Sequence, residues 1–438
     1  MLRMNKEDEL TGEQLLEFIE QNEADNIKRL RMKNQFESNP PIRDGVDGTH
    51  KDVDENGKPD NRLIANFARY LVLNFNGYFI GVPARVSHDD ETINEIITEF
   101  WRQNDMDDIL DELGKLSSIY GNAYLFMYQD EDAQTKLAYL PPLNVFNIYS
   151  DEIKPSTVYG VHYRVTEDGY SGDLYSEDEE VSFTLDGDKL IYGESEPLYY
   201  GRVPLIEFVE NEERLSLIDP VEVAINAYNK ILSEKSNDID YFADAYLAIL
   251  GMELDEKAQF EFRQNRLINS DSKEVVIEFL EKPNADESQE NQLDRLERLI
   301  YTLSMVTNTS ENSVGGGNSS GVASGEALKV KQQPMQNMAI SKERKFESGL
   351  QTMFRMFFNL VTNVPASKRD EYINIDYTWT RNTPKNLTEE IDNAAKAQSI
   401  LSEETQISLI SAVSNAKEEI ERKREEDEPL PQYDFEKE

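Results

Sequence analysis

The sequence predicts an α+β fold in which a block of short strands lies between long amphipathic helices. Apolar residues recur at helical spacing through much of residues 12–120 and again after Asp219. Between these regions, residues 121–210 form short runs rich in Tyr, Phe and Val, separated by Asp, Gly and Pro. A chain of 438 residues, 38% of them hydrophobic, is long enough for more than one domain and for sizeable cores.

Residues 1–60 predict an N-terminal helix followed by a polar linker. The helix covers residues 12–36, where apolar positions follow the helical period, and the turn-rich stretch after it predicts the linker. Residues 62–81 return to the helical period. Two more helices are expected within residues 91–120, with a break near the polar stretch QNDMDD.

The strand block contains runs such as NAYLFMY, VYGVHYRV, EVSFTL and PLIEFVE. Their spacing is close to ten residues, and acidic turns such as SEDEE separate them. This pattern predicts a twisted antiparallel sheet with solvated loops.

A helical hairpin is expected next. Residues 219–250 predict one long helix, with Asp219 as the N-cap and Pro220 at the first helical position. Residues 251–287 predict a small mixed unit, with a helix in DEKAQFEFRQNRL and a strand in KEVVIEFLE. The second helix of the hairpin covers residues 288–308, so the small unit is expected at its tip.

The stretch NSVGGGNSSGVASGEALKVK follows the hairpin and opens a helix over residues 322–364. Pro334 lies inside this helix and predicts a kink, because proline removes a backbone donor and clashes with the preceding turn. A strand is expected in EYINIDYTWTRN, and two helices on either side of LSEET within residues 386–428. Residues 429–438 predict a disordered acidic tail.

The glycine-rich stretch does not fit a nucleotide-binding loop. A P-loop requires GxxxxGK[ST], in which the lysine reaches the phosphates and the hydroxyl holds magnesium. Gly325 is followed by Glu326, whose carboxylate would repel phosphate, and the segment before the loop is helical rather than a strand. The GxGxxG spacing fails as well, since Ser320 stands where the third glycine is required.

Other catalytic and metal-binding patterns are also missing from the sequence. Cysteine is absent, which excludes disulfides and thiolate sites, and the three histidines (His50, His88 and His162) form no HExxH. No GxSxG motif occurs. Asp240 and Asp244 are spaced to share a helix face, but a solvated acidic face explains them better than a metal site. We therefore expect no catalytic residue, metal or cofactor.

The net charge of −41 arises from 86 acidic and 45 basic residues. Such a chain repels nucleic acid at long range, so any contact with DNA is expected to be local or transient. Solubility alone explains the charge equally well. The N-terminus contains no signal-peptide pattern, and no run of 18 apolar residues occurs, so we expect a chain that is made inside the cell and is not inserted in a membrane.

Basic residues dominate one segment of this acidic chain. Between Ala327 and Arg369 only Glu343 and Glu347 are acidic, against eight basic residues: Lys329, Lys331, Lys342, Arg344, Lys345, Arg355, Lys368 and Arg369. The segment follows the glycine-rich stretch directly. It fits either a zone that guides a polyanion without holding it, or a helix face paired with acidic neighbours.

Several stretches in this order and spacing resemble a known family. They are NRLIANFARYLVLNFNGYFIGVPARV, SSIYGNAYLFMYQDEDAQTKLAYLPPLNVFNIYSDE, RVPLIEFVENEERLSLIDPVEVAINAYNKILSEKSNDIDYFADAYLAILG, SGVASGEALKVK and ILSEETQISLISAV. The chain resembles the portal proteins of tailed double-stranded DNA bacteriophages of the siphovirus type. The similarity runs from about Asn61 to Glu426. No single stretch is specific to the family, but the order and spacing of the stretches together are specific to it.

The resemblance implies a subunit of a ring, usually of twelve copies, around a central channel. It divides the chain into the named parts of the portal-protein fold. These are an α/β wing (61–218 with 366–385), stem helices (219–250 and 288–308), a clip (251–287), a tunnel loop (309–321), a kinked tunnel helix (322–364) and a helical crown (386–428).

For the glycine-rich stretch, the resemblance implies a loop at the narrowest part of the channel. Small side chains leave room there and allow several backbone conformations. The implied loop residues are Thr309, Ser310, Asn312, Gly315, Gly316, Gly317, Asn318, Ser319 and Ser320. Lys329 and Lys331 would provide weak, exchangeable phosphate contacts just outside the loop.

The implied function is a conduit at one capsid vertex, through which double-stranded DNA is packaged and ejected. The implied partners are further copies of the chain, the DNA, the terminase large subunit, the major capsid and scaffolding proteins, and a head–tail adaptor. The implied location is the virion, with assembly in the host cytoplasm. Two alternatives are a structural neck ring without DNA translocation and a nucleotide-using packaging enzyme. The missing Walker lysine argues against the second.

Overall fold

Helices form most of the first 120 residues in the computed structural model, as the sequence predicts. They are α1 (Gly12–Phe36), α2 (Phe67–Ile80), α3 (Glu91–Gln103) and α4 (Met106–Tyr120). The structure describes residues 2–43, 60–243, 247–250, 276–279, 286–308, 325–383, 387–410, 413 and 416–427. These residues are divided between two units, Met1–Thr380 and Arg381–Glu438.

Local signals explain where these helices begin and end. Thr11 and Gln14 form a capping box before α1, in which each side chain bonds to the backbone N–H of the other. Between α3 and α4, Asp105 adopts a left-handed φ of 49°. The buried Asn104 side chain there donates to Thr135 O at 3.2 Å and accepts from Leu137 N at 2.9 Å. The break is therefore held against the strand that contains these two residues.

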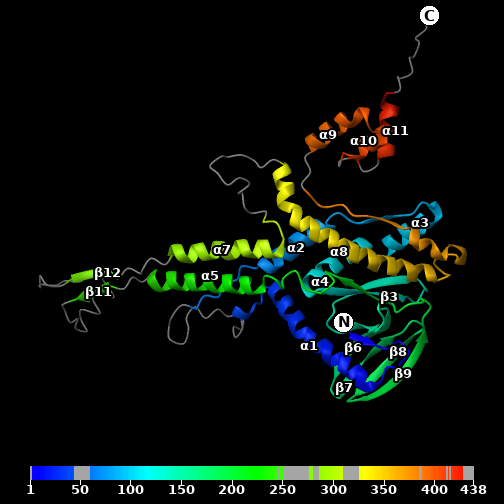
Figure 1. Cartoon of the computed structure of the whole chain (residues 1–438), viewed down its shortest axis with the longest axis horizontal. Helices are drawn as coiled ribbons and strands as arrows, with labels where there is room; N and C mark the ends of the chain where they lie inside the picture. The colour runs from blue at the N-terminus through cyan, green and yellow to red at the C-terminus, as the bar shows by residue number, and fades with distance from the viewer. Residues whose placement is uncertain are drawn as a thin grey trace, which may run out of the picture. The chain divides into compact units, whose positions relative to one another are not determined.

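The strands form two main sheets, not the one antiparallel sheet that was expected. The larger has the order β1–β5–β6–β7–β8–β9 and the smaller β10–β3–β4. Figure 1 labels β6 to β9 of the larger sheet and β3 of the smaller one. The bounds are β1 (Leu2–Met4), β3 (Asn122–Gln129), β4 (Thr135–Leu140), β5 (Val145–Ser150), β6 (Thr157–Thr166), β7 (Gly169–Tyr175), β8 (Glu179–Asp186), β9 (Lys189–Pro197) and β10 (Leu205–Val209). Neighbours are antiparallel except β1, which pairs with β5 in parallel.

Separate cores explain the two sheets. Leu15 and Ile19 of α1 are fully buried against the larger sheet, on residues such as Ile148 and Val161. The smaller sheet instead joins a larger core that contains residues of α2, α3 and α4. The two sheets therefore pack against different helices.

The helix predicted over residues 219–250 is shorter than expected, and its predicted N-cap is wrong. The helix expected over residues 219–250 is α5 (Glu222–Ala243), and β11 (Leu247–Leu250) follows it. Asp219 is not an N-cap but lies in a turn, where its Oδ2 accepts from Ser216 N at 2.8 Å. Salt bridges from Lys28 to Asp219 and from Arg31 to Glu222 connect α1 to this turn and to the start of α5.

The helical hairpin itself is confirmed. α7 (Asp286–Ser304) packs along α5, and Figure 1 shows the two helices side by side. β11 pairs antiparallel with β12 (Val276–Phe279), which confirms the strand expected in KEVVIEFLE. The helix expected in DEKAQFEFRQNRL lies outside the described residues.

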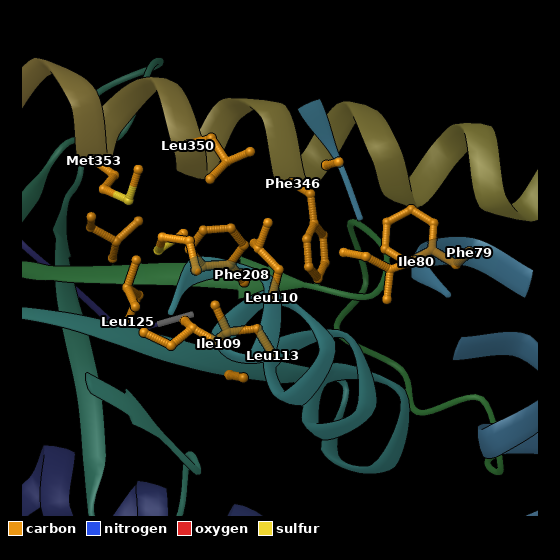
Figure 2. Close-up of a cluster of buried hydrophobic side chains, with 14 of the residues drawn as sticks. Phe79, Ile80, Ile109, Leu110, Leu113, Leu125, Phe208, Phe346, Leu350 and Met353 are labelled. Carbon is orange, nitrogen blue, oxygen red and sulfur yellow. The ribbon is translucent and has the colours of Figure 1, made fainter. Parts of the chain in front are cut away.

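The long helix α8 (Gly325–Asn359) packs its apolar face on the smaller sheet and on α4, and Pro334 lies inside it as expected. Phe346, Leu350 and Met353 point towards Phe208 of β10 and Leu125 of β3 (Figure 2). All five side chains are fully buried. The kink expected at Pro334 stays a prediction.

A buried ion pair connects α8 to α4 and to the end of β10. Lys342 is 0% exposed, and its Nζ lies 2.5 Å from the buried Glu210 Oε2. The same ammonium donates to Gly114 O at 2.8 Å and to Ser118 Oγ at 2.9 Å. It also lies 5.2–5.4 Å from the ring centroids of Phe75, Phe79 and Phe346. Burial lowers the pKa of Lys342, and the Glu210 carboxylate opposes that shift.

The strand expected in residues 371–382 is mostly wrong. Ala366–Asn374 is a 3₁₀ helix, and only β13 (Asp376–Thr378) is extended, paired antiparallel with β2 (Arg85–Ser87). In the second unit, the two helices expected within residues 386–428 are three: α9 (Leu387–Lys396), α10 (Glu403–Ser408) and α11 (Ala416–Asp427). Ser402 caps α10 by accepting from Thr405 N, at the break expected in LSEET, and the additional division is that between α10 and α11. The expected acidic tail lies outside the described residues.

Phe208→Ala should destabilise the first unit. The ring is fully buried and meets Phe346 edge-on at a centroid distance of 5.1 Å. Loss of a buried aromatic ring costs about 3–5 kcal/mol of unfolding free energy, because a cavity remains. Urea denaturation measures the change. Ile27→Ala, at a side chain that is 72% exposed, is the control and should change stability by less than about 0.5 kcal/mol. Equal effects of both variants would contradict the packing described.

Lys342→Ala should be as severe, by about 3–5 kcal/mol, because it leaves the Glu210 carboxylate buried without its cation. The double variant Lys342→Met/Glu210→Leu removes both charges and keeps much of the volume. It should therefore be more stable than Lys342→Ala in the same urea titration. A double variant less stable than the single one would show that the charge pair is not what makes the single variant unstable.

Candidate DNA-channel segment

The predicted loop residues, from Thr309 to Ser320, lie outside the described residues. Lys329 lies in α8, but its side chain is also outside them. The geometry of the candidate segment therefore rests on the residues just before and just after the loop.

The chain just before the loop is bonded to the first turns of α8, the helix that follows the loop. The Thr307 hydroxyl donates to the backbone carbonyl of Lys331 at 3.4 Å, across 24 residues of chain. Val306 and Thr307 are buried, so the chain that enters the loop is anchored in the first unit. Asn308 Nδ2 donates back to Glu297 of α7 at 3.3 Å. The loop thus starts from and returns to one fixed base.

The first turns of α8 differ from the rest of the helix. Val330 is 74% exposed and Lys331 is exposed as well, whereas Met335 and Ala339 are buried. The Tyr78 hydroxyl bonds to Gln336, one turn after Lys331. The buried face of α8 therefore begins near Met335. The turns of α8 before Met335 lie between that buried face and the end of the loop.

Acidic neighbours neutralise part of the predicted basic segment. Lys342 is paired with Glu210 in the core, Lys345 bonds to Glu212, and Lys368 bonds to Asp90 at 2.6 Å. The hydrogen bond from Lys368 lowers the pKa of the Asp90 carboxyl. For these three lysines the helix-face explanation is correct, and they are not available to a polyanion. Lys331, at the loop end, stays a candidate.

A basic cavity lies behind α8, and sequence reasoning did not predict it. It has a volume of about 800 Å³ and lies between α8, β10 and the loop that precedes β10. Arg202 and Arg355 both line it. No sequence motif could have revealed it, because its cationic side chains are far apart in the chain.

Within the described part of the chain, no group of His, Asp and Glu side chains is placed to hold a metal ion. No described helix is both long and apolar enough to cross a membrane.

Comparison with known proteins agrees with this arrangement. The portal protein of Bacillus phage SPP1 is 24% identical over 403 residues, which cover 87% of this chain and 79% of that protein. Among solved structures, the neck of an empty GTA particle, computed with C6 symmetry, matches with a TM-score of 0.50 at 12% identity. That match covers 87% of this chain and 93% of the other, and it shows similarity of fold. Residues 16–430 match the family described as phage portal protein, SPP1 Gp6-like, and the chain belongs to that family.

Proposed function

We propose that this chain forms a closed ring, of twelve copies, at one vertex of a phage capsid, and that double-stranded DNA passes through the ring during packaging and ejection. Membership of the portal family over residues 16–430 carries the proposal. The family consists of ring-forming structural proteins and not of enzymes. In this role the ring works in the virion after assembly in the host cytoplasm.

The anchored loop base supports a channel role for the glycine-rich stretch. Thr307, just before the loop, is bonded to Lys331 of α8, and α8 is fixed in the core from Met335 onwards. A loop of small residues on such a base can reach into a channel without filling it. Residues Thr309–Ser320 would then line the axis.

The partners follow from the same role. The terminase large subunit would supply the ATP-driven motor, since this chain has no Walker lysine. The major capsid and scaffolding proteins would surround the ring, and a head–tail adaptor would bind below it. The second candidate is a neck ring that takes no part in DNA translocation, and the match to a particle neck is compatible with both.

Deletion of Gly315–Gly317 should leave rings intact and impair DNA packaging. The deletion shortens the loop but leaves its base and the helical hairpin unchanged. Electron microscopy of the purified chain measures ring formation, and an in vitro packaging assay measures DNA uptake. The substitution of all three glycines by alanine keeps the loop length and is the matched control, which should package better than the deletion. Normal packaging by the deletion would favour the neck ring without translocation.

Lys329→Ala/Lys331→Ala should slow packaging and preserve rings, because weak phosphate contacts next to the loop are lost. The control is Arg102→Ala/Lys189→Ala, which removes two positive charges from exposed positions on α3 and β9. A kinetic packaging assay at several salt concentrations separates the two variants. If both slow packaging equally, net charge matters and these lysines do not.

A further inference from the structure

The basic cavity behind α8 contains more positive charge than its surroundings neutralise. Six basic side chains line it: Lys6, Lys154, Arg202, Arg214, Lys345 and Arg355. Only Glu177 and Glu207 oppose them on its walls. In a chain with a net charge of −41, such a local excess of positive charge requires an explanation. We call this cavity the arginine groove.

Two of the six cations are already paired. Arg214 Nε and one of its terminal nitrogens lie 2.7 and 2.6 Å from the two carboxylate oxygens of Glu207. Lys345 bonds to Glu212, outside the groove. Burial raises the pKa of Glu207, but the bonds from Arg214, Tyr149 and Asn122 outweigh it and hold that pKa below its ordinary value. Glu207 is therefore fully used by its present partners.

The other four cations form no ion pair with any residue that the structure describes. Arg202 and Arg355 are the central pair. The Nε atom of Arg202 is buried and has no hydrogen-bond partner among the described residues. Burial lowers the pKa of Arg202, and repulsion by Arg355 lowers it further, with Glu177 opposing. A guanidinium without a partner, close to a second one, is costly unless an anion joins them.

The loop that holds Arg202 is fixed in place. Gly201 has a φ of +66°, and a side chain there would come within 2.9 Å of Asn359 Nδ2. That amide donates to Tyr199 O at 2.8 Å, which connects the loop to the end of α8. Arg202 and Arg355 are thus carried by elements joined to each other, so both line the groove from fixed backbone positions, and a guanidinium can bind paired carboxylate oxygens.

Carboxylate is the oxyanion that best fits this groove. Long-range repulsion by the net charge acts on DNA and on other copies of this chain alike, but subunits held in one ring keep their acidic segments close to each other's grooves. The volume of about 800 Å³ exceeds what one small anion requires, and Tyr149, Tyr372 and Ile373 add less polar wall. A short acidic stretch of polypeptide matches both the charge and the size. Other copies of this chain, with 86 acidic residues each, are its most abundant source in a ring.

We infer that the arginine groove receives an acidic segment of a neighbouring copy of this chain, whose carboxylates bind between Arg202 and Arg355. The inference rests on the proposed ring. It explains how subunits that repel each other through their net charge still associate, since local attraction at the groove opposes the long-range repulsion.

The test compares two variants with the same change in net charge. Arg202→Ala/Arg355→Ala removes the two groove cations, and Arg102→Ala/Lys189→Ala removes two exposed cations elsewhere. Sedimentation velocity of the full chain, from about 0.05 to 0.5 M salt, measures association across the range in which screening changes most. Thermal unfolding of each variant shows that the fold is kept.

The groove variant should associate at least about tenfold more weakly than the wild type near 0.15 M salt, the cost of one lost charge-assisted contact. Its association should also increase with salt, because only repulsion between copies remains to be screened. The control should behave like the wild type. Equal association of both variants would overturn the inference and leave the proposed ring intact. Absence of rings in the wild type would instead contradict the proposed function.

A second experiment tests whether DNA phosphate, instead of carboxylate, binds in the groove. A short duplex, added at low salt, should bind the wild type and the groove variant equally weakly. Binding by the wild type that disappears in the groove variant would show that the groove takes phosphate, and would overturn the assignment to a carboxylate segment.

Discussion

The buried pair of Lys342 and Glu210 is the interaction on which the arrangement of the first unit depends. It joins three elements that are far apart in the sequence, α4, the end of β10 and α8, at one point inside an aromatic core. A buried charge tolerates little displacement from its partner, so the pair fixes α8 along its axis as well as against the sheet. Hydrophobic contacts alone, which are not directional, would permit sliding.

Charged side chains are arranged differently at the surface and in the core. The surface carries a large excess of negative charge, while two cations of α8 pair with carboxylates of this chain: Lys342 with Glu210 in the core, and Lys345 with Glu212 outside the groove. What the sequence presents as one basic segment is therefore divided among three environments: the core, the groove and the exposed first turns of α8. The effective dielectric constant differs among these environments, so the same positive charge contributes a different electrostatic energy in each.

Local patterns predicted local structure well. The bounds of α1 match the predicted ones, because helical periodicity and the Thr11–Gln14 capping box agree there. The end of α5 was predicted wrongly because AYLAIL is a short apolar run, which helix and strand accommodate equally well. The burial of Lys342 could not be foreseen, since lysine is rarely buried and its partner lies far away in the sequence. The arginine groove could not be foreseen either, because its cationic side chains lie far apart in the sequence.

The bond between Thr307 and Lys331 has a mechanical consequence. It joins the chain that follows α7 to the first turns of α8, so a load on either one is shared by the other. Because Lys342 holds α8 further along, that point acts as a pivot, and the exposed turns before Met335 act as a short lever arm. A sideways load on these exposed turns would therefore bend the arm before it disturbed the core.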